Sequence, residues 1–195
     1  MLVSISILFN FREITNTLRC MMILIYIVAA ILIIVIILAA IGPKTFDVSR
    51  SILVDKPKEI VFPYIKMVKN QDHWSPWKQK DPNMKQTYTG TDGEVGFKAR
   101  WEGNKEVGMG SQTITAIVEN ERIDNHLIFL KPWKSESDGY YTVEDASPGQ
   151  TKVVWGFKGH NKFPGTIFML FFNMDKTVGK DFEEGLQNLK KILET

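Results

Sequence analysis

A long uncharged, apolar run near the N-terminus constrains this chain more than any other feature. Between Arg19 and Lys44 no residue is charged, and Met21–Ile41 is apolar almost throughout. At 1.5 Å rise per residue, a helix of about 21 residues is about 30 Å long, which matches the hydrocarbon core of a bilayer. A Gly-Pro pair follows and ends the helix, because proline cannot continue the backbone hydrogen-bond ladder. The sequence therefore predicts a transmembrane helix over residues 21–42.

A cleaved signal peptide is the competing interpretation of this run. The apolar region of a signal peptide is usually only about 7–15 residues long and ends at a small-x-small cleavage site. Leu38-Ala39-Ala40 matches that site poorly, so we expect an uncleaved, single-pass anchor in the cell membrane. Residues 1–20 form an N-terminal extension, and translation that started at Met21 instead would remove it.

The positive charges that flank the run predict its orientation. Upstream are Arg12 and Arg19; downstream are Lys44, Arg50, Lys56 and Lys58. The positive-inside rule therefore favours a C-terminal domain on the cytoplasmic side.

Charge and cysteine content exclude several classes of protein. The formal net charge is only +2, which argues against a nucleic-acid binder that relies on a broad basic surface. The single cysteine, Cys20, excludes an intramolecular disulfide framework and a zinc site built from cysteines. Residues 44–195 contain no low-complexity linker, so we expect one domain there.

The pattern of this domain predicts an α+β fold. Residues 46–54 alternate apolar and polar as in a half-buried strand, and residues 58–67 form a short amphipathic helix, followed by an irregular helical segment near 70–77. Six more strand-like runs follow between turn signals, at 85–89, 95–102, 109–118, 126–131, 140–144 and 153–157. Residues 163–193 then have helical spacing with one apolar face, and a kink near Asn173 or Gly179 is compatible with this spacing. We expect a curved antiparallel sheet wrapped around this long C-terminal helix, with a cavity between the two.

This order of elements resembles the helix-grip fold of the SRPBCC (START and Bet v 1-like) superfamily. The segments Trp74–Trp77, Lys80–Met84, Trp101–Asn104 and Gly179–Leu186 are similar to bacterial polyketide cyclase/dehydrase-like members. The resemblance covers residues 44–195, and many such relatives begin with one hydrophobic anchor. It implies the fold, but the superfamily spans lipid carriers, cyclases, hydratases, chaperone-activating domains and proteins of unknown role, so it does not fix a function.

No residue pattern predicts a catalytic centre. His73, His126 and His160 have no metal-ligand spacing, and neither a nucleophile elbow nor a phosphate-binding loop is present. We therefore predict no metal, no cofactor and no catalytic residue, and we lean away from an enzyme. Arg100, His126 and Tyr140 are polar side chains that could face a cavity, although Arg100 and Trp101 lie on opposite faces of a regular strand.

Aromatic residues are the candidates for ligand binding. They are as well explained by core packing, but several together would form the apolar, concave wall that ligand sites require. The candidates are Trp74, Trp77, Trp101, Phe129, Trp133, Tyr140, Trp155, Phe168 and Phe172.

We therefore predict a membrane-anchored domain that binds a hydrophobic small molecule or lipid between its sheet and C-terminal helix. We expect no nucleic-acid partner, and the sequence names no protein partner. Two alternatives stay open: a cyclase- or hydrolase-type enzyme acting on a hydrophobic substrate, and a protein-interaction module whose cavity is filled by side chains.

Overall fold

The structure of the chain is a computed structural model that describes the backbone of residues 2–195 and the side chains of residues 16–195. Met1, and the side chains of the predicted N-terminal extension up to residue 15, lie outside the described part. The chain forms two compact units. One comprises residues 1–43 with 162–171, and the other residues 44–161 with 172–195.

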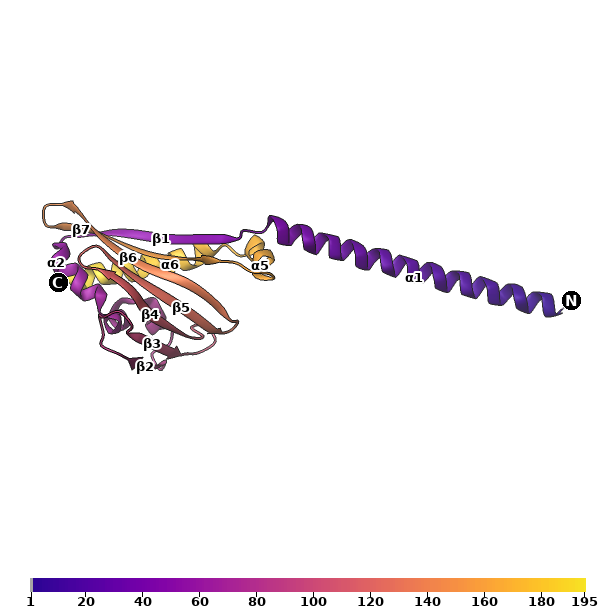
Figure 1. Cartoon of the computed structure of the whole chain (residues 1–195), viewed down its shortest axis with the longest axis horizontal. Helices are drawn as coiled ribbons and strands as arrows, with labels where there is room; N and C mark the ends of the chain where they lie inside the picture. Colours follow the sequence, from indigo (N-terminus) through magenta and orange to yellow (C-terminus); the bar gives the residue numbers. More distant parts are fainter. Residues whose placement is uncertain (1) are drawn as a thin grey trace. The chain divides into compact units, whose positions relative to one another are not determined.

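The second unit is built on one antiparallel sheet of seven strands, in the order β1-β7-β6-β5-β4-β3-β2 (Figure 1). The strands are β1 (Thr45–Val54), β2 (Lys85–Thr89), β3 (Lys98–Glu102), β4 (Met109–Val118), β5 (Arg122–Lys131), β6 (Ser135–Ser147) and β7 (Gln150–His160). Strands β2 to β7 follow one another as a meander, and β1 closes the other edge by pairing with β7, where Val48 lies opposite Phe157. The predicted alternation of β1 is confirmed, since Val48 and Val54 are buried while their neighbours Asp47 and Leu53 are exposed.

Four short helical segments connect β1 to β2. They are α2 (Lys58–Lys66), η1 (Val68–Asn70), α3 (Gln71–Trp74) and α4 (Pro76–Lys80). Proline at the first position of α4 suits a helix start, because the missing N–H would have no partner there. The carboxylate of Asp92 fixes the join between α2 and η1, since it accepts from the Val68 N–H at 2.8 Å and the Lys69 N–H at 3.2 Å.

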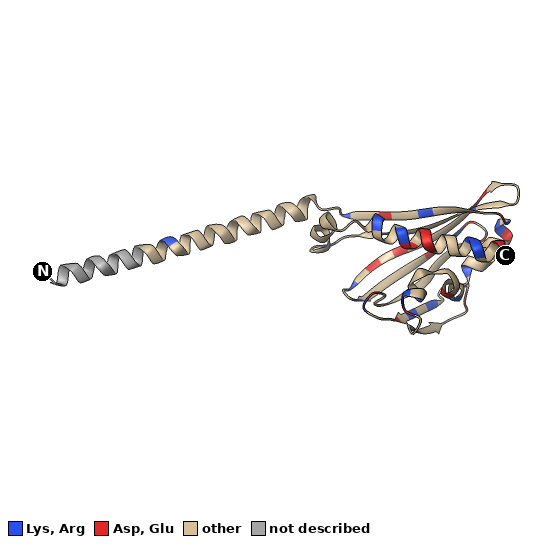
Figure 2. Cartoon of the chain, turned by 180° about the vertical axis from the view of Figure 1, so that it is seen from behind, with Lys and Arg blue, Asp and Glu red and all other residues tan. Residues whose placement is uncertain are grey.

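The long helix α6 (Met174–Glu194) packs its apolar face on the sheet. Phe182, Leu186 and Leu189 on that face are at most 2% exposed. Gly185 lets the helix come close, because a Cβ there would lie 2.7 Å from Cζ3 of Trp155. The opposite side carries the charged residues, with lysines and acidic residues interspersed along the helix in Figure 2. The domain therefore has the α+β helix-grip fold that the sequence predicted.

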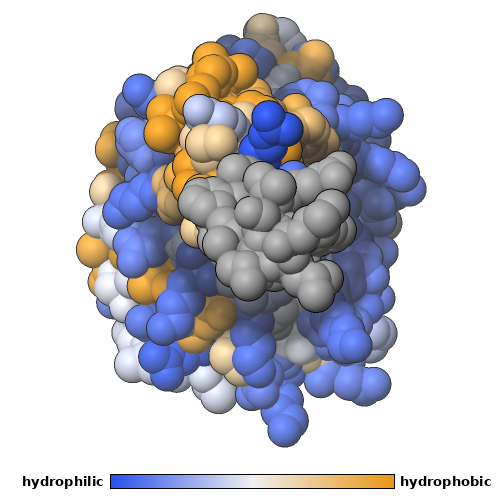
Figure 3. Space-filling model, turned by 90° about the vertical axis from the view of Figure 1, so that its right-hand side faces the viewer, coloured by the Kyte–Doolittle hydropathy of each residue, from blue (hydrophilic) through white to orange (hydrophobic). Residues whose placement is uncertain are grey.

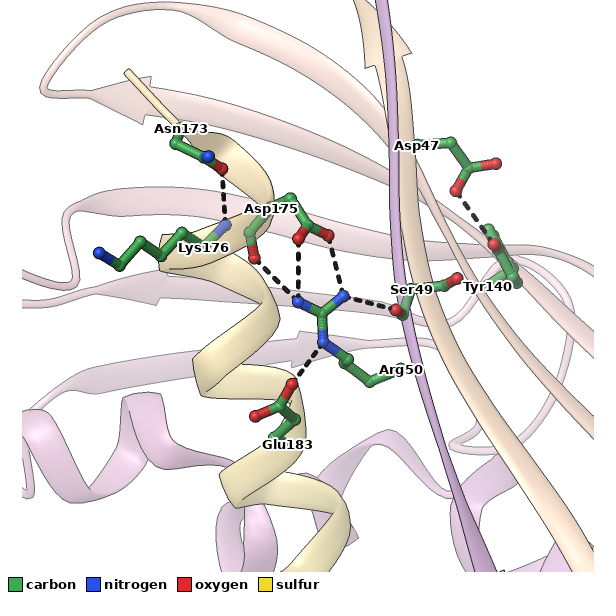
Figure 4. A network of polar contacts seen from close by, with 8 residues as sticks. All are labelled: Asp47, Ser49, Arg50, Tyr140, Asn173, Asp175, Lys176 and Glu183. Carbon is green, nitrogen blue, oxygen red and sulfur yellow. Dashed lines mark hydrogen bonds and ion pairs between the residues drawn. The ribbon is translucent and has the colours of Figure 1, made fainter. Parts of the chain in front are cut away.

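Arg50 of β1 ties the sheet to the first half of α6 (Figure 4). Its guanidinium donates from Nη1 and Nη2 to the two carboxylate oxygens of Asp175 at 2.8 and 3.1 Å, and from Nε to Glu183 at 2.6 Å. Both partners raise the pKa of Arg50, and the bond from Arg50 lowers the pKa of Asp175. Because a Cβ on Gly179 would collide with this guanidinium, glycine keeps the place open.

The long C-terminal helix predicted over residues 163–193 is broken next to Asn173, one of the two positions where a kink was compatible with the sequence. Two helices occupy this stretch, α5 (Gly165–Phe171) and α6, with a break at residues 172–173. Asn173 adopts an extended conformation, and its side-chain oxygen accepts from the Lys176 N–H at 2.8 Å. Asn173 is thus the N-cap of α6, and capping by asparagine starts a new helix because it satisfies an amide that has no partner within the helix.

The first unit consists of α1 (Leu2–Ile41) and α5. Residues Asn16–Ile41 of α1 are long and apolar enough to cross a membrane, and none of the qualifying window is buried. A signal sequence satisfies the same criteria of length and composition. The helix is longer than the predicted 21–42 because residues 2–20 continue it without a break.

Candidate functional site

A cavity of about 390 Å³ lies in the helix-grip domain. Residues from η1, α3, α4, strands β2 to β7 and α6 line it. Its apolar wall is largely aromatic and includes Trp77, Trp101, Leu127, Phe129, Trp155, Phe157 and Phe182. The rings contact one another edge-on, with centroids 5.9 Å apart for Trp101 and Phe129 and 5.5 Å apart for Trp77 and Trp155. The volume falls within the range of about 300–1,000 Å³ that is typical of small-molecule sites.

Side-chain amides form the inner polar groups of the cavity. Asn125 of β5 is only 2% exposed, and its Oδ1 accepts from Nε2 of Gln112 on β4 at 3.1 Å. Nε2 of Gln71 is buried without a hydrogen-bond partner among the described residues. A buried amide N–H without a partner costs about 1–3 kcal/mol, so this donor is suited to an acceptor that a ligand or water supplies.

The charged groups on the cavity lining are balanced and mostly paired. Three are acidic and three basic: Asp72, Glu106 and Asp181 against Lys78, Arg100 and Lys131. Gln86 links one group of them, because its Nε2 donates to Asp72 at 2.8 Å and its Oε1 accepts from Lys78 Nζ at 3.2 Å. Asp181 on α6 accepts from Lys80 Nζ at 2.7 Å. The lining therefore carries no net charge that would select an anionic or cationic ligand.

Five of the predicted site residues line the cavity. They are Trp77, Trp101, Phe129, Trp133 and Trp155. Trp155 is 6% exposed and stacks on Phe182 of α6 with ring centroids 4.3 Å apart, so it forms a rigid part of the wall. Trp133 is 64% exposed, in the turn between β5 and β6, and stands at an open part of the lining.

The other four predicted residues do not line the cavity. Trp74 is fully buried and packs edge-on against Tyr141 and Trp155, so it supports the wall from behind. Tyr140 lies on the opposite face of the sheet, where its ring covers Gly156 and its hydroxyl donates to Asp47 at 3.0 Å (Figure 4).

Phe168 and Phe172 are placed differently from the prediction because the C-terminal helix is divided in two. Phe168 belongs to α5 in the first unit, and Phe172 lies in the break before α6. Neither contributes to the cavity lining.

Of the polar residues that could face a cavity, one lines it and the others do not. Arg100 contributes to the lining beside Trp101, although the two are adjacent in β3. His126 faces away from the cavity, with Nδ1 3.2 Å from Asp138 and Nε2 3.5 Å from Glu136. His73 contacts the hydroxyl of Tyr64 at 3.2 Å. Among the residues whose side chains are described, no group of three or more His, Cys, Asp or Glu is arranged to hold a metal ion.

Sequence reasoning missed the amides and one buried tyrosine. In β5 the inward positions run Ile123, Asn125, Leu127 and Phe129, so Asn125 is a polar residue in an otherwise apolar series, which was the available signal. Tyr141 lines the cavity next to the outward-facing Tyr140. Burial strongly raises the pKa of Tyr141, so its hydroxyl stays protonated and neutral.

Comparison with known proteins finds a family that matches the helix-grip domain. The sequence profile of a family described as polyketide cyclase / dehydrase and lipid transport matches residues 45–194. No curated protein sequence matches the chain.

Several solved structures share the fold at low sequence identity. A protein from Nitrosospira multiformis is 20% identical with a TM-score of 0.55, over 76% of this chain and 96% of its own. The ginseng major latex-like protein 151 from Panax ginseng is 9% identical with a TM-score of 0.57, over 78% and 100%. The Zhui aromatase/cyclase from a Streptomyces species is 12% identical with a TM-score of 0.55, over 77% and 94%.

Proposed function

Since the chain belongs to the polyketide cyclase/dehydrase and lipid transport family, we propose that residues 44–195 bind a hydrophobic small molecule or lipid in the cavity between sheet and α6. The observation that carries this proposal is an open, aromatic-walled volume of about 390 Å³. Liquid water would fill it with roughly a dozen molecules at about 30 Å³ each. Their displacement from apolar walls by an apolar ligand is favourable. A module whose cavity is filled by side chains would lack this volume.

The polar groups refine the chemical class of the ligand. Amides of Gln71, Gln112 and Asn125 offer hydrogen bonds without charge, and the ionic groups of the lining balance. A charged headgroup would lose its hydration in this site without gaining an opposite net charge. We therefore propose an amphiphile that is largely apolar and carries an uncharged hydrogen-bonding group such as a hydroxyl, ketone or ester.

We propose further that α1 anchors this domain in the membrane, with the domain on the cytoplasmic side. The apolar stretch Asn16–Ile41 supports a single span. More positive residues follow the helix than precede it, which supports the cytoplasmic orientation.

Calorimetric titration of a chain beginning at Lys44 with decanol, decanoate and decane tests the binding. We expect saturable binding of decanol, weaker binding of decanoate, and no saturable binding in a variant whose cavity is filled by Leu127→Trp. Leu130→Trp is the matched control, because Leu130 lies on the same strand, is 43% exposed and does not line the cavity. Equal binding by the two variants would show that the ligand site lies elsewhere.

A further inference from the structure

An uncharged aromatic segment separates the sheet from α6. From Phe163 to Met174 the chain contains no Asp, Glu, Lys or Arg. Three large side chains of this segment are exposed: Phe163, just before α5, at 66%, and Phe168 and Phe171 of α5 at 45% and 79%. Single exposed apolar residues are ordinary on a protein surface, but three phenylalanines within nine residues form a patch of the kind that marks an interaction site.

Helix α5 of this segment packs against the end of α1. The two helices are in contact within the first unit, and Figure 1 shows α5 beside the last turn of α1. Gly42, directly after α1, lies so close to Thr166 of α5 that a Cβ there would collide with the Thr166 backbone. Thr166 itself is 6% exposed. The buried side of α5 thus rests on the end of α1, and its phenylalanines are left outside.

The end of α1 sets the depth at which α5 must lie. The apolar run stops at Ile41, and Lys44 is the first charged residue after it. A membrane helix that ends in this way leaves the hydrocarbon at this point, so residues in contact with Gly42 lie at the boundary between headgroups and acyl chains. Seven helical residues extend only about 10 Å, which is too short to cross a bilayer but suits a helix lying in its surface.

From this geometry we propose that α5 is a second membrane-contact element, whose phenylalanines insert into the interfacial layer of the leaflet from which α1 emerges. The proposal rests on the proposed anchoring by α1. Lipid is the occupant that the structure favours over a protein partner, because the patch adjoins the end of α1, whose exposed surface from Met21 to Ile41 is apolar on all sides. Figure 3 shows hydrophobic side chains, in orange, among hydrophilic ones on the face turned to the viewer.

Depth-dependent quenching of the full-length chain tests this directly. Cys20→Ser removes the native thiol, and a single cysteine is then introduced by Phe171→Cys and labelled with an environment-sensitive fluorophore. The labelled chain is reconstituted into phosphatidylcholine vesicles that contain doxyl lipids with the quencher either near the headgroup or near the bilayer centre. We expect a blue-shifted emission and a loss of fluorescence with the shallow quencher that exceeds the loss with the deep one.

Two further label sites separate the possible failures. Ile31→Cys lies in the middle of the apolar run of α1 and should be quenched most by the deep lipid. Val95→Cys, at a site 61% exposed in the helix-grip domain, should be quenched by neither and should remain accessible to aqueous iodide.

Quenching at residue 31 without quenching at residue 171 would overturn the role of α5 and leave the anchor intact. If residue 171 were also shielded from iodide, the patch would belong to a protein contact instead. Absence of quenching at residue 31 would refute the anchor, and the proposal for α5 with it.

Discussion

The amide pair inside the cavity gives the sharpest test of how this domain combines stability with the proposed ligand binding. Asn125 is 2% exposed and accepts one hydrogen bond from Gln112 at 3.1 Å. Asn125→Leu keeps a similar shape but leaves Nε2 of Gln112 without its acceptor. A buried donor or acceptor without a partner costs about 1–3 kcal/mol, and because Gln112 is only half-buried we expect a loss of about 1 kcal/mol in the free energy of unfolding. Gln112→Leu should cost a similar amount, because it leaves the carbonyl oxygen of Asn125 unpaired.

The double variant should recover most of that loss. Replacing both partners of a buried hydrogen bond by apolar groups of similar shape is nearly neutral or stabilising. We therefore expect the double variant to be at least about 1 kcal/mol more stable than the sum of the two single effects implies.

Urea unfolding of the full-length chain in detergent, followed by tryptophan fluorescence, measures all four proteins of this cycle. The signal reports the helix-grip domain alone, because all five tryptophans lie in residues 74–155. Strictly additive losses would refute the reasoning, since they would show that the two amides do not stabilise each other.

Ligand selectivity gives the second half of the test. A neutral hydrogen bond contributes about 0.5–1.5 kcal/mol net, which corresponds to a change of about two- to twelvefold in affinity. The double variant should therefore lose about that factor in its preference for decanol over decane. An unchanged preference would place the hydrogen-bonding group of the ligand elsewhere in the cavity.

Three further predictions concern α6 and the anchor. Arg50 lowers the pKa of Asp175, so their contact stabilises the fold fully above the ordinary aspartate pKa of about 3.9. This stabilisation is lost as the pH falls through the lowered pKa. The urea midpoint of Asp175→Asn should therefore depend less on pH below about 4 than the midpoint of the wild type does. Leu186→Ala should cost about 2–5 kcal/mol in urea unfolding, because Leu186 is 1% exposed, whereas Ile192→Ala, at 38% exposure, should cost clearly less; equal losses would contradict the placement of the core. The full-length chain should stay in the membrane pellet after carbonate washing while a chain beginning at Lys44 is soluble and folded, and release of the full-length chain would refute the anchor.

The sequence predicted the architecture well where periodicity reports burial. Alternation in β1 indicated a half-buried strand and the recurring turn signals indicated an antiparallel meander, and both are confirmed. The apolar spacing from Val178 to Leu189 likewise identified the face of α6 that packs on the sheet. These signals are local consequences of one buried face, so one sequence is enough to read them.

The division of the C-terminal helix was harder to predict because residues 163–174 are apolar in nearly every position. A stretch that is apolar in nearly every position has no clear period that could show where one helix stops and another starts. The capping role of Asn173 was the available signal, but an asparagine between apolar residues is also compatible with a helix interior.

Predicting the cavity residues requires knowing which alternate residues of each strand face inward, and residue types alone do not show this. Tyr140 and Tyr141 are adjacent, so one must face the cavity and the other the outer surface. The sequence prediction chose Tyr140, whereas Tyr141 lines the cavity because it is in phase with Gly139. Asn125 was passed over because it is polar, although its inward position gives the cavity wall a hydrogen-bonding group.

The aromatic residues of this chain divide between two environments, and the proposed function would use both. One set, centred on Trp155 and Phe129, forms the apolar wall of the cavity. The other, in α5, is exposed beside the end of the anchor and is proposed to meet lipid. A hydrophobic ligand partitions into the bilayer and is scarce in water, so a binding site tethered to the bilayer meets it at a much higher effective concentration than a freely diffusing site would. Under that condition a cavity with uncharged polar groups and moderate affinity is sufficient, and this links the proposed anchor to the proposed ligand.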